Sequence, residues 1–325
     1  MTGSYPILFP LRGANSINKR LLSSLKVINP ELTVTLDLSI DPKKLNIFNG
    51  FILDHHIFGQ DIKTSNMLYL NPRFFEKSDN KVVPTSFMIY KVLKKMFPEE
   101  GASWIGCIGV TEDHRVEACK EIFEDTEKNY PNLIKTKITQ EDIENSIFGI
   151  MWDMVRSGRM VKGEEGTKTS VLSLIECKDR PDQFINGLTT NSYSVKKFYE
   201  KMVSEIENSL NDFEKTATFY RDKKVVVFEP KKVNLSGITS FLSDKIRKMY
   251  PEWIVCVVNR NQRGGKVKIS IRIEQNKRET NLVELLEKIK INVPSAIGGG
   301  HKSAIGINMD IDELNNFFEE LLASV

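Results

Sequence analysis

The chain has 325 residues, of which 40% are hydrophobic and 27% are charged, and its formal net charge is +3. This length suffices for two or three domains, and this charge neither indicates nucleic-acid binding on its own nor excludes a local basic groove. No stretch approaches the roughly 20 uninterrupted apolar residues of a membrane helix, and the N-terminus lacks the order of a secretory signal, so we expect a cytoplasmic protein.

The first third of the chain alternates apolar runs with an amphipathic segment. The runs at 32–39 (LTVTLDLS), 50–56 (GFILDHH) and 103–113 (SWIGCIGVTED) are predicted strands that end in acidic residues, and 85–97 has helical spacing. Strands that alternate with helices predict an α/β fold with a parallel sheet covered on both faces. In such sheets the ligand crevice lies beyond the carboxyl ends of the strands, where these acids fall.

Acidic and histidine side chains follow the predicted strand ends. They are Asp37, Asp54, His55, His56 and Asp113. A parallel sheet would bring them together at one edge, and carboxylates with imidazoles suit Mn²⁺ or Mg²⁺. Two such ions about 3.5–4 Å apart can activate water for attack on a phosphodiester. The alternative is a hydrogen-bonded pair of histidines that caps a strand.

The middle and last thirds of the chain differ in pattern. From about 140 to 220 the spacing is helical, with a loop predicted at 184–194, whereas 223–325 predicts a β-α-β-β-α-β order before a terminal helix. The last third therefore predicts a smaller α/β domain with its own core. Its hairpin region is predicted to be either part of a nucleic-acid groove or a solvated edge that lysines protect. Its basic residues are Arg260, Arg263, Lys266, Lys268 and Arg272.

Two motifs in the last third resemble a known domain. ISIR at 269–272 and GGGHKSAIG at 298–306 are similar to the C-terminal DHHA1 domain of the DHH phosphoesterases. In that family a glycine-rich turn and its histidine approach the phosphates of the substrate, because a side chain would keep backbone amides away from an anion. A helix C-cap or a tight turn is the alternative. The resemblance implies nucleic-acid contacts from Lys266, Lys268, Arg272, Gly298, Gly299, Gly300, His301 and Lys302.

The first third resembles the RecJ-like branch of the same superfamily, which includes bacterial RecJ, the archaeal GINS-associated nuclease and the eukaryotic cell-division-cycle protein forty-five. LDLS at 36–39, DHH at 54–56 and GVTED at 109–113 are similar to its second, third and fourth motifs. The resemblance implies that Asp37 bridges two metals and that His55 and Asp113 bind one of them. It implies that His56 faces the phosphate and that Asp54 orients a histidine without binding metal.

The resemblance covers nearly the whole chain and predicts three parts. They are a DHH-type domain at 1–139, a helical connector at 140–220 and a DHHA1-type nucleic-acid-binding domain at 221–325. The family's first motif, an Asp-rich loop that binds the other ion, should precede Asp37. Residues 1–36 contain no aspartate and no histidine, and Glu31 is their single acid. The neutral side chains of Asn15, Ser16 and Asn18 are poor replacements for anionic ligands.

Three functions remain open on this basis. The first is a catalytically inactive, archaeal-type replication protein that holds single-stranded DNA or RNA and, by family analogy, binds the GINS complex and the MCM helicase. The second is a manganese-dependent, single-strand-specific exonuclease or oligonucleotide phosphodiesterase. The third is an enzyme whose missing motif comes from a partner chain. For this chain by itself we expect one Mn²⁺ or Mg²⁺ ion at Asp37, His55 and Asp113, or none.

Overall fold

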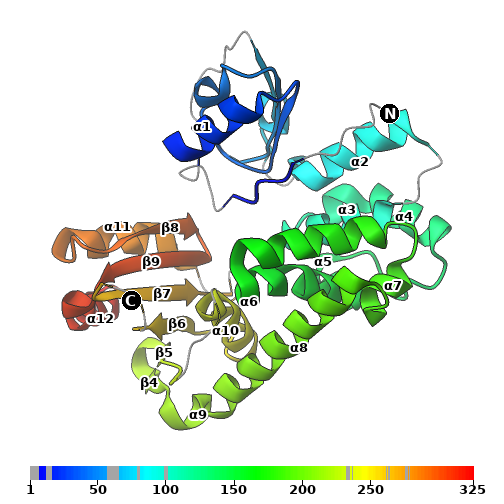
Figure 1. Cartoon of the computed structure of the whole chain (residues 1–325). Coiled ribbons are helices and arrows are strands. Elements are labelled where there is room, and N and C mark those ends of the chain that lie inside the picture. The colour runs from blue at the N-terminus through cyan, green and yellow to red at the C-terminus, as the bar shows by residue number, and fades with distance from the viewer. Residues whose placement is uncertain are drawn as a thin grey trace. The chain divides into compact units, whose positions relative to one another are not determined.

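The computed structural model describes residues 7–11, 17–56, 66–78, 81–98, 102–231, 235, 237–260, 262, 264–274, 277 and 279–325. The chain divides into two compact units, Met1–Tyr199 and Glu200–Val325, which we describe separately. The predicted α/β class is confirmed, with a parallel sheet in the first unit and a mixed sheet in the second (Figure 1). The division into three parts at 139/140 and 220/221 stays a prediction. None of the helices in the described ranges is long and apolar enough to cross a bilayer.

The first unit begins with a small parallel sheet. Helix α1 (Lys19–Ile28) precedes strands β1 (Thr33–Leu36), β2 (Gly50–Leu53) and β3 (Met67–Leu70), which pair in that order. Alternate residues such as Ile52 and Met67 point into a core with Leu25 of α1. The residues between them, including Val34 and Leu68, are about half exposed. The prediction that both faces of this sheet are covered is therefore wrong for the described residues, because their alternating burial is that of a sheet packed on one side.

Helices form the remainder of the first unit. They are α2 (Thr85–Met96), α3 (Ser103–Glu112), α4 (Lys120–Asn129), α5 (Gln140–Glu144), α6 (Ile147–Glu176), α7 (Pro181–Asn186) and α8 (Thr190–Asn211), of which α8 continues into the second unit. The helix predicted at 85–97 is confirmed. The predicted strand at 103–113 is wrong. This segment is a helix that buries Trp104, Cys107 and Val110. In a segment that is buried on all sides, apolar residues show no periodicity, so the sequence pattern cannot distinguish a helix from a buried strand.

The helical region contains a break within α6 and a connection between α7 and α8. Helix α6 consists of two helices that meet at Gly163, whose φ of 64° lies in the left-handed region. The Ser170 Oγ donates to the Val155 carbonyl at 2.9 Å, so the two halves lie side by side. The loop predicted at 184–194 is shorter than expected, because α7 extends to Asn186 and ends at a left-handed Gly187.

The second unit contains a six-stranded sheet with helices on both faces. The strand order is β4-β5-β6-β7-β9-β8, and the bounds are β4 (Thr218–Tyr220), β5 (Val225–Phe228), β6 (Ile254–Asn259), β7 (Lys266–Arg272), β8 (Ile297–His301) and β9 (Ala304–Asp310). The helices are α9 (Phe213–Thr216), α10 (Ile238–Met249), α11 (Leu282–Asn292) and α12 (Leu314–Ala323). Helix α10 packs on β6 and β7, while α11 and α12 bury the opposite core (Figure 1). The predicted order of strands and helices is confirmed, with β4 as an added edge strand and the final strand resolved into β8 and β9.

The glycine-rich segment lies in a strand, so the prediction of a turn at 298–300 is wrong. Gly298, Gly299 and Gly300 belong to β8, which pairs antiparallel with β9 and forms an edge of the sheet. The chain reverses direction at Lys302 and Ser303 instead. A prediction from glycine content alone misses this, because glycine is required here by the close approach of the neighbouring strand β9 and not by a turn at these residues.

Candidate functional site

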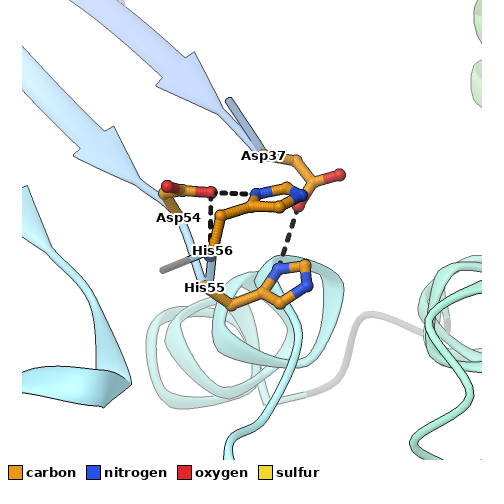
Figure 2. A group of neighbouring side chains, drawn as sticks. All are labelled: Asp37, Asp54, His55 and His56. Carbon is orange, nitrogen blue, oxygen red and sulfur yellow. Dashed lines mark hydrogen bonds and ion pairs between the residues drawn. The ribbon is translucent and has the colours of Figure 1, made fainter. Parts of the chain in front are cut away.

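The carboxyl ends of β1 and β2 bring four candidate ligands together. Asp37 follows β1, and the DHH residues Asp54, His55 and His56 follow β2 (Figure 2). One ligand atom from each of the four lies within 4.8 Å of the others. The main chain sets this placement, because the Asp37 N–H donates to the Leu53 carbonyl at 2.9 Å and so prolongs the pairing of β1 with β2. Asp37 has a φ of 56°, which turns the chain away from the sheet there.

His55 lies between two carboxylates. Its Nδ1 is 3.1 Å from Asp37 Oδ1, and its Nε2 is 3.7 Å from Asp113 Oδ1. Thr85 at the start of α2 also contacts Nδ1, at 3.4 Å. Asp113 follows helix α3, so it reaches the site from a helix end and not from the predicted strand end. Because the two carboxylates approach opposite nitrogens of one ring, Asp113 lies beside the group of four and is not part of it.

His56 is held by Asp54. Its Nδ1 is 2.6 Å from Asp54 Oδ1, and its backbone N–H donates to the same oxygen at 3.3 Å. Asp54 is fully buried, whereas the His56 side chain is 46% exposed. The two histidine rings stack with their centroids 4.6 Å apart. The carboxylate of Asp54 therefore faces a histidine and not solvent, while the His56 side chain is partly exposed to solvent.

Side chains in β3 and just after it support this arrangement, and sequence reasoning did not select them. The Tyr69 hydroxyl donates to Asp54 Oδ2 at 3.0 Å, and Asn71 Nδ2 donates to the His56 carbonyl at 3.0 Å. Arg73 Nε donates to the His55 carbonyl at 2.6 Å. The signal that points to them is weak: YLNPRF places polar residues just after a third strand end, as Asp37 and Asp54 are placed after the first two.

Charges within the cluster shift several pKa values. Burial raises the pKa of Asp37 and of Asp54, but hydrogen bonds and charge from the adjacent histidines outweigh burial and hold both values below the ordinary range. The hydrogen bond to Asp54 raises the pKa of His56. Burial raises the pKa of Asp113 to about 6, opposed by His55 and reinforced by neighbouring carboxylates. The cluster therefore contains ionised carboxylates together with one carboxyl that gains a proton in mildly acidic solution.

Asn in place of Asp113 is expected to stabilise the protein at neutral pH. A carboxyl whose pKa is raised on folding loses stability as the pH rises from its ordinary value of 3.8 through its folded value of about 6. Asp113→Asn removes this cost, so the free energy of unfolding should rise at pH 7–8 by on the order of 1 kcal/mol and be unchanged at pH 4 and below. Urea unfolding across this pH range is the measurement. Asp182→Asn, at an exposed pair with Arg180, is the control that should bring no gain.

The predicted nucleic-acid residues of the second unit lie on β7, β8 and the turn after it. Gly299, Gly300, His301 and Lys302 are exposed. Arg272 is not, because its side chain is 15% exposed and its Nε lies 3.0 Å from Asp244 Oδ1.

Other cations of the predicted basic hairpin are paired within the second unit. Lys266 pairs with Asp310, and Arg260 pairs with Glu229. Lys268 is partly buried in β7. Arg263 lies outside the described residues. These pairs reduce the local positive charge, whereas His301 and Lys302 are exposed.

The donor set fits a divalent ion. Carboxylate oxygen and imidazole nitrogen within a few ångströms of one another are ligands that Mn²⁺ accepts, and Mg²⁺ accepts the oxygens. In the described part of the chain, no other group of three or more histidine, cysteine, aspartate or glutamate side chains converges in this way. Asn18 caps α1 through its side chain, and Asn15 and Ser16 lie outside the described residues. The residues present thus suit one ion.

Comparison with known proteins identifies the second unit and the fold. Residues 222–325 match the DHHA1 domain. RecJ from Thermus thermophilus, solved with Mn²⁺, superposes with a TM-score of 0.67 at 14% identity over 94% of this chain and 46% of that one. The DHH domain of a protein assigned to a family of ribosomal proteins gives 0.63 at 14% identity, over 97% and 76% of the two chains.

A pGpG-specific phosphodiesterase from Vibrio gives a TM-score of 0.50 at 14% identity, over 96% of this chain and 95% of that one. No curated protein sequence matches the chain. The chain spans about half the length of the Thermus RecJ that it matches. Residues 222–325 are therefore a DHHA1 domain, and the chain as a whole has a RecJ-like fold.

Proposed function

We propose that this protein is a RecJ-like replication protein that holds single-stranded DNA and has lost two-metal catalysis. The observation that carries the proposal is the composition of the DHH cluster. Asp37, His55 and His56 supply ligand atoms close to one another, with Asp54 turned towards His56. Residues 1–36 add no aspartate or histidine to them. This donor set can hold one ion through Asp37 and His55, with Asp113 as the predicted third ligand.

A single ion is a poor basis for hydrolysis of a phosphodiester. One bound divalent ion would polarise a phosphate oxygen, whereas a two-metal site would stabilise both the attacking and the leaving oxygen. Loss of that second contribution should remove about 3–4 kcal/mol or more of transition-state stabilisation, as the loss of one strong electrostatic contact does elsewhere. The residues of this chain then bind and orient a phosphate backbone without cleaving it.

The DHHA1 domain supports the binding part of the proposal. His301, Lys302 and Gly299 are exposed, and nothing lies within 4 Å of the position that a Cβ on Gly299 would take. Amides and cations of this kind bind a phosphate backbone without reading its sequence. The resemblance to RecJ-like proteins extends the proposal to two partners, the GINS complex and the MCM helicase. It leaves single-stranded RNA as an alternative ligand, because recognition of a 2′-hydroxyl depends on finer geometry.

A second candidate function is a manganese-dependent phosphodiesterase acting on single strands or short oligonucleotides. The observation that favours it is the intact DHH group, in a chain that superposes on nearly the full length of a pGpG-specific phosphodiesterase. The Thermus RecJ is solved with Mn²⁺ and with Mg²⁺, so both metals are the ones to test. This function requires ligands from a segment or a partner chain that supplies the first motif.

Metal titration and digestion of the same sample test the proposal. We expect calorimetry to give at most one Mn²⁺ per chain, and we expect a labelled single-stranded DNA to bind in a salt-dependent manner without cleavage in millimolar Mn²⁺. Asp37→Ala should abolish the metal signal. Asp182→Ala is a matched control, because the Asp182 side chain is 52% exposed and that of Asp37 is 50% exposed, each beside a basic partner.

Two results would separate the candidates. Two tight Mn²⁺ ions per chain, with cleavage that Asp37→Ala abolishes and Asp182→Ala preserves, would establish the phosphodiesterase. No binding of single-stranded DNA at low salt would overturn the binding proposal, whatever the metal does. A pull-down from native extract then identifies the partner.

A further inference from the structure

The end of β3 forms a hydrogen-bonded support beneath the DHH residues. Asn71 is 2% exposed, and its Nδ2 contacts both the His56 carbonyl and the Tyr69 hydroxyl, at 3.0 and 3.3 Å. Its Oδ1 accepts from the Arg73 backbone N–H at 2.9 Å and so caps the N-terminus of the short helix η3 (Pro72–Phe74). Asn71 is therefore fixed on both sides of its amide, and it fixes the main chain of His56 in turn.

Tyr69 fixes the other partner of His56. Its hydroxyl, on a residue that is 8% exposed, donates to Asp54 Oδ2. The other carboxylate oxygen, Oδ1, is left to the ring and the backbone N–H of His56. Because both oxygens of this fully buried carboxylate are engaged, it cannot rotate without breaking a hydrogen bond in a place where water does not replace it.

The protonation pattern of His56 follows from this geometry. An ionised carboxylate only accepts hydrogen bonds, so the His56 nitrogen 2.6 Å from Asp54 carries the hydrogen. In the neutral ring the remaining nitrogen, Nε2, then has a free lone pair. Figure 2 shows this edge of the ring on the side of Asp37, away from Asp54. The partner of one nitrogen thus decides what the other nitrogen offers.

We propose that Tyr69 and Asn71 are positioning residues that hold His56 in the Nδ1–H tautomer with Nε2 directed to the Asp37 side of the cluster. Neither residue lies in a motif, and both act through Asp54 and the main chain. The inference deepens the proposed function. It rests on that function only for the identity of the ligand that His56 would contact, which is a phosphate or a metal ion. The tautomer itself requires no ligand.

Nitrogen NMR of the whole chain with ¹⁵N-labelled histidine tests the tautomer directly. The protein has four histidines, and His56→Gln assigns the signal. At about pH 9, where imidazole is neutral, the wild type should show His56 as a single Nδ1–H tautomer. In Tyr69→Phe, which removes only the hydroxyl, the His56 nitrogens should move towards the average of the two tautomers. Asn71→Ala should do the same.

Tyr90→Phe is the matched control. Tyr90 is 9% exposed, and its hydroxyl also donates to a carboxylate, that of Asp125. A merely structural loss would lower the melting temperature of both tyrosine variants and leave His56 unchanged in both. A His56 spectrum that is identical in wild type and folded Tyr69→Phe, or a wild type in the Nε2–H tautomer, would overturn the inference. If Asn71→Ala does not fold, Tyr69→Phe decides alone. Absence of Mn²⁺ or DNA binding by the wild type bears on the proposed function and leaves the tautomer result standing.

Discussion

Alanine at position 298 or 300 is expected to destabilise the second unit, whereas alanine at 299 is expected to be tolerated. A Cβ on Gly298 would lie 2.2 Å from the Gly306 carbonyl oxygen, and one on Gly300 would lie 2.1 Å from that of Ala304. Both oxygens belong to β9, the only described strand that pairs with β8. Gly300 also has a φ of 152°, which other residues seldom adopt. Nothing lies within 4 Å of a Cβ on Gly299.

The size of the effect follows from what must move. Backbone cannot shift as a flexible side chain does, so Gly298→Ala and Gly300→Ala should force β8 away from β9 and lower the free energy of unfolding by about 2–4 kcal/mol. Gly299→Ala should change it by no more than about 0.5 kcal/mol. Urea unfolding of the three variants is the measurement. Equal stability of all three would contradict the packing of β8 described above.

Gly299→Ala also tests whether Gly299 is required for DNA binding and not for stability. Because its outer face is open, an added methyl group leaves the fold unchanged but keeps a phosphate from the backbone amides. Weaker binding of single-stranded DNA at unchanged stability is therefore expected for this variant. Unchanged affinity would remove β8 from the proposed DNA-binding surface while leaving the DHHA1 fold as it is.

Arg272→Ala is expected to destabilise the second unit by about 1–3 kcal/mol. The guanidinium lies against the sheet, where Nε pairs with Asp244 of α10 and Nη1 donates to the carbonyls of Ile271 and Ile305 at 3.0 and 3.2 Å. These contacts tie α10, β7 and β9 together. Loss of the side chain removes these three hydrogen bonds of a guanidinium group on a side chain that is only 15% exposed, which costs more than loss of an exposed pair.

Arg260→Ala is the control for this prediction. The Arg260 side chain is 46% exposed and its partner Glu229 is 41% exposed, so the change in unfolding free energy should stay within about 0.5 kcal/mol. Thermal unfolding of both variants is compared with DNA binding at low salt and at a temperature where both are folded. A melting temperature that Arg272→Ala leaves unchanged, together with a large loss of affinity, would instead make Arg272 a phosphate ligand that is free to leave Asp244.

Local sequence patterns predicted most elements because those elements depend on local periodicity. The amphipathic spacing of 85–97 specifies one face of a helix, and the predicted helix is confirmed. The DHH residues and Asp37 were placed together for a similar reason, since both follow strands whose carboxyl ends lie at one edge. These relations require only the order of residues and the geometry of a strand.

The sequence by itself determined the two strand ends that carry Asp37 and the DHH residues, the α/β pattern of the last third, and the lack of aspartate and histidine in residues 1–36. Only the tertiary structure decided that 103–112 is a helix, that Gly298–Gly300 form an edge strand, and that Tyr69 and Asn71 hold the DHH residues. The physical reason is the same in each case. A segment buried on all sides has no periodic spacing of apolar residues that would indicate its type. A close approach of two strands, or a buried hydrogen bond, depends on a partner residue that is distant in the sequence and comes near only on folding.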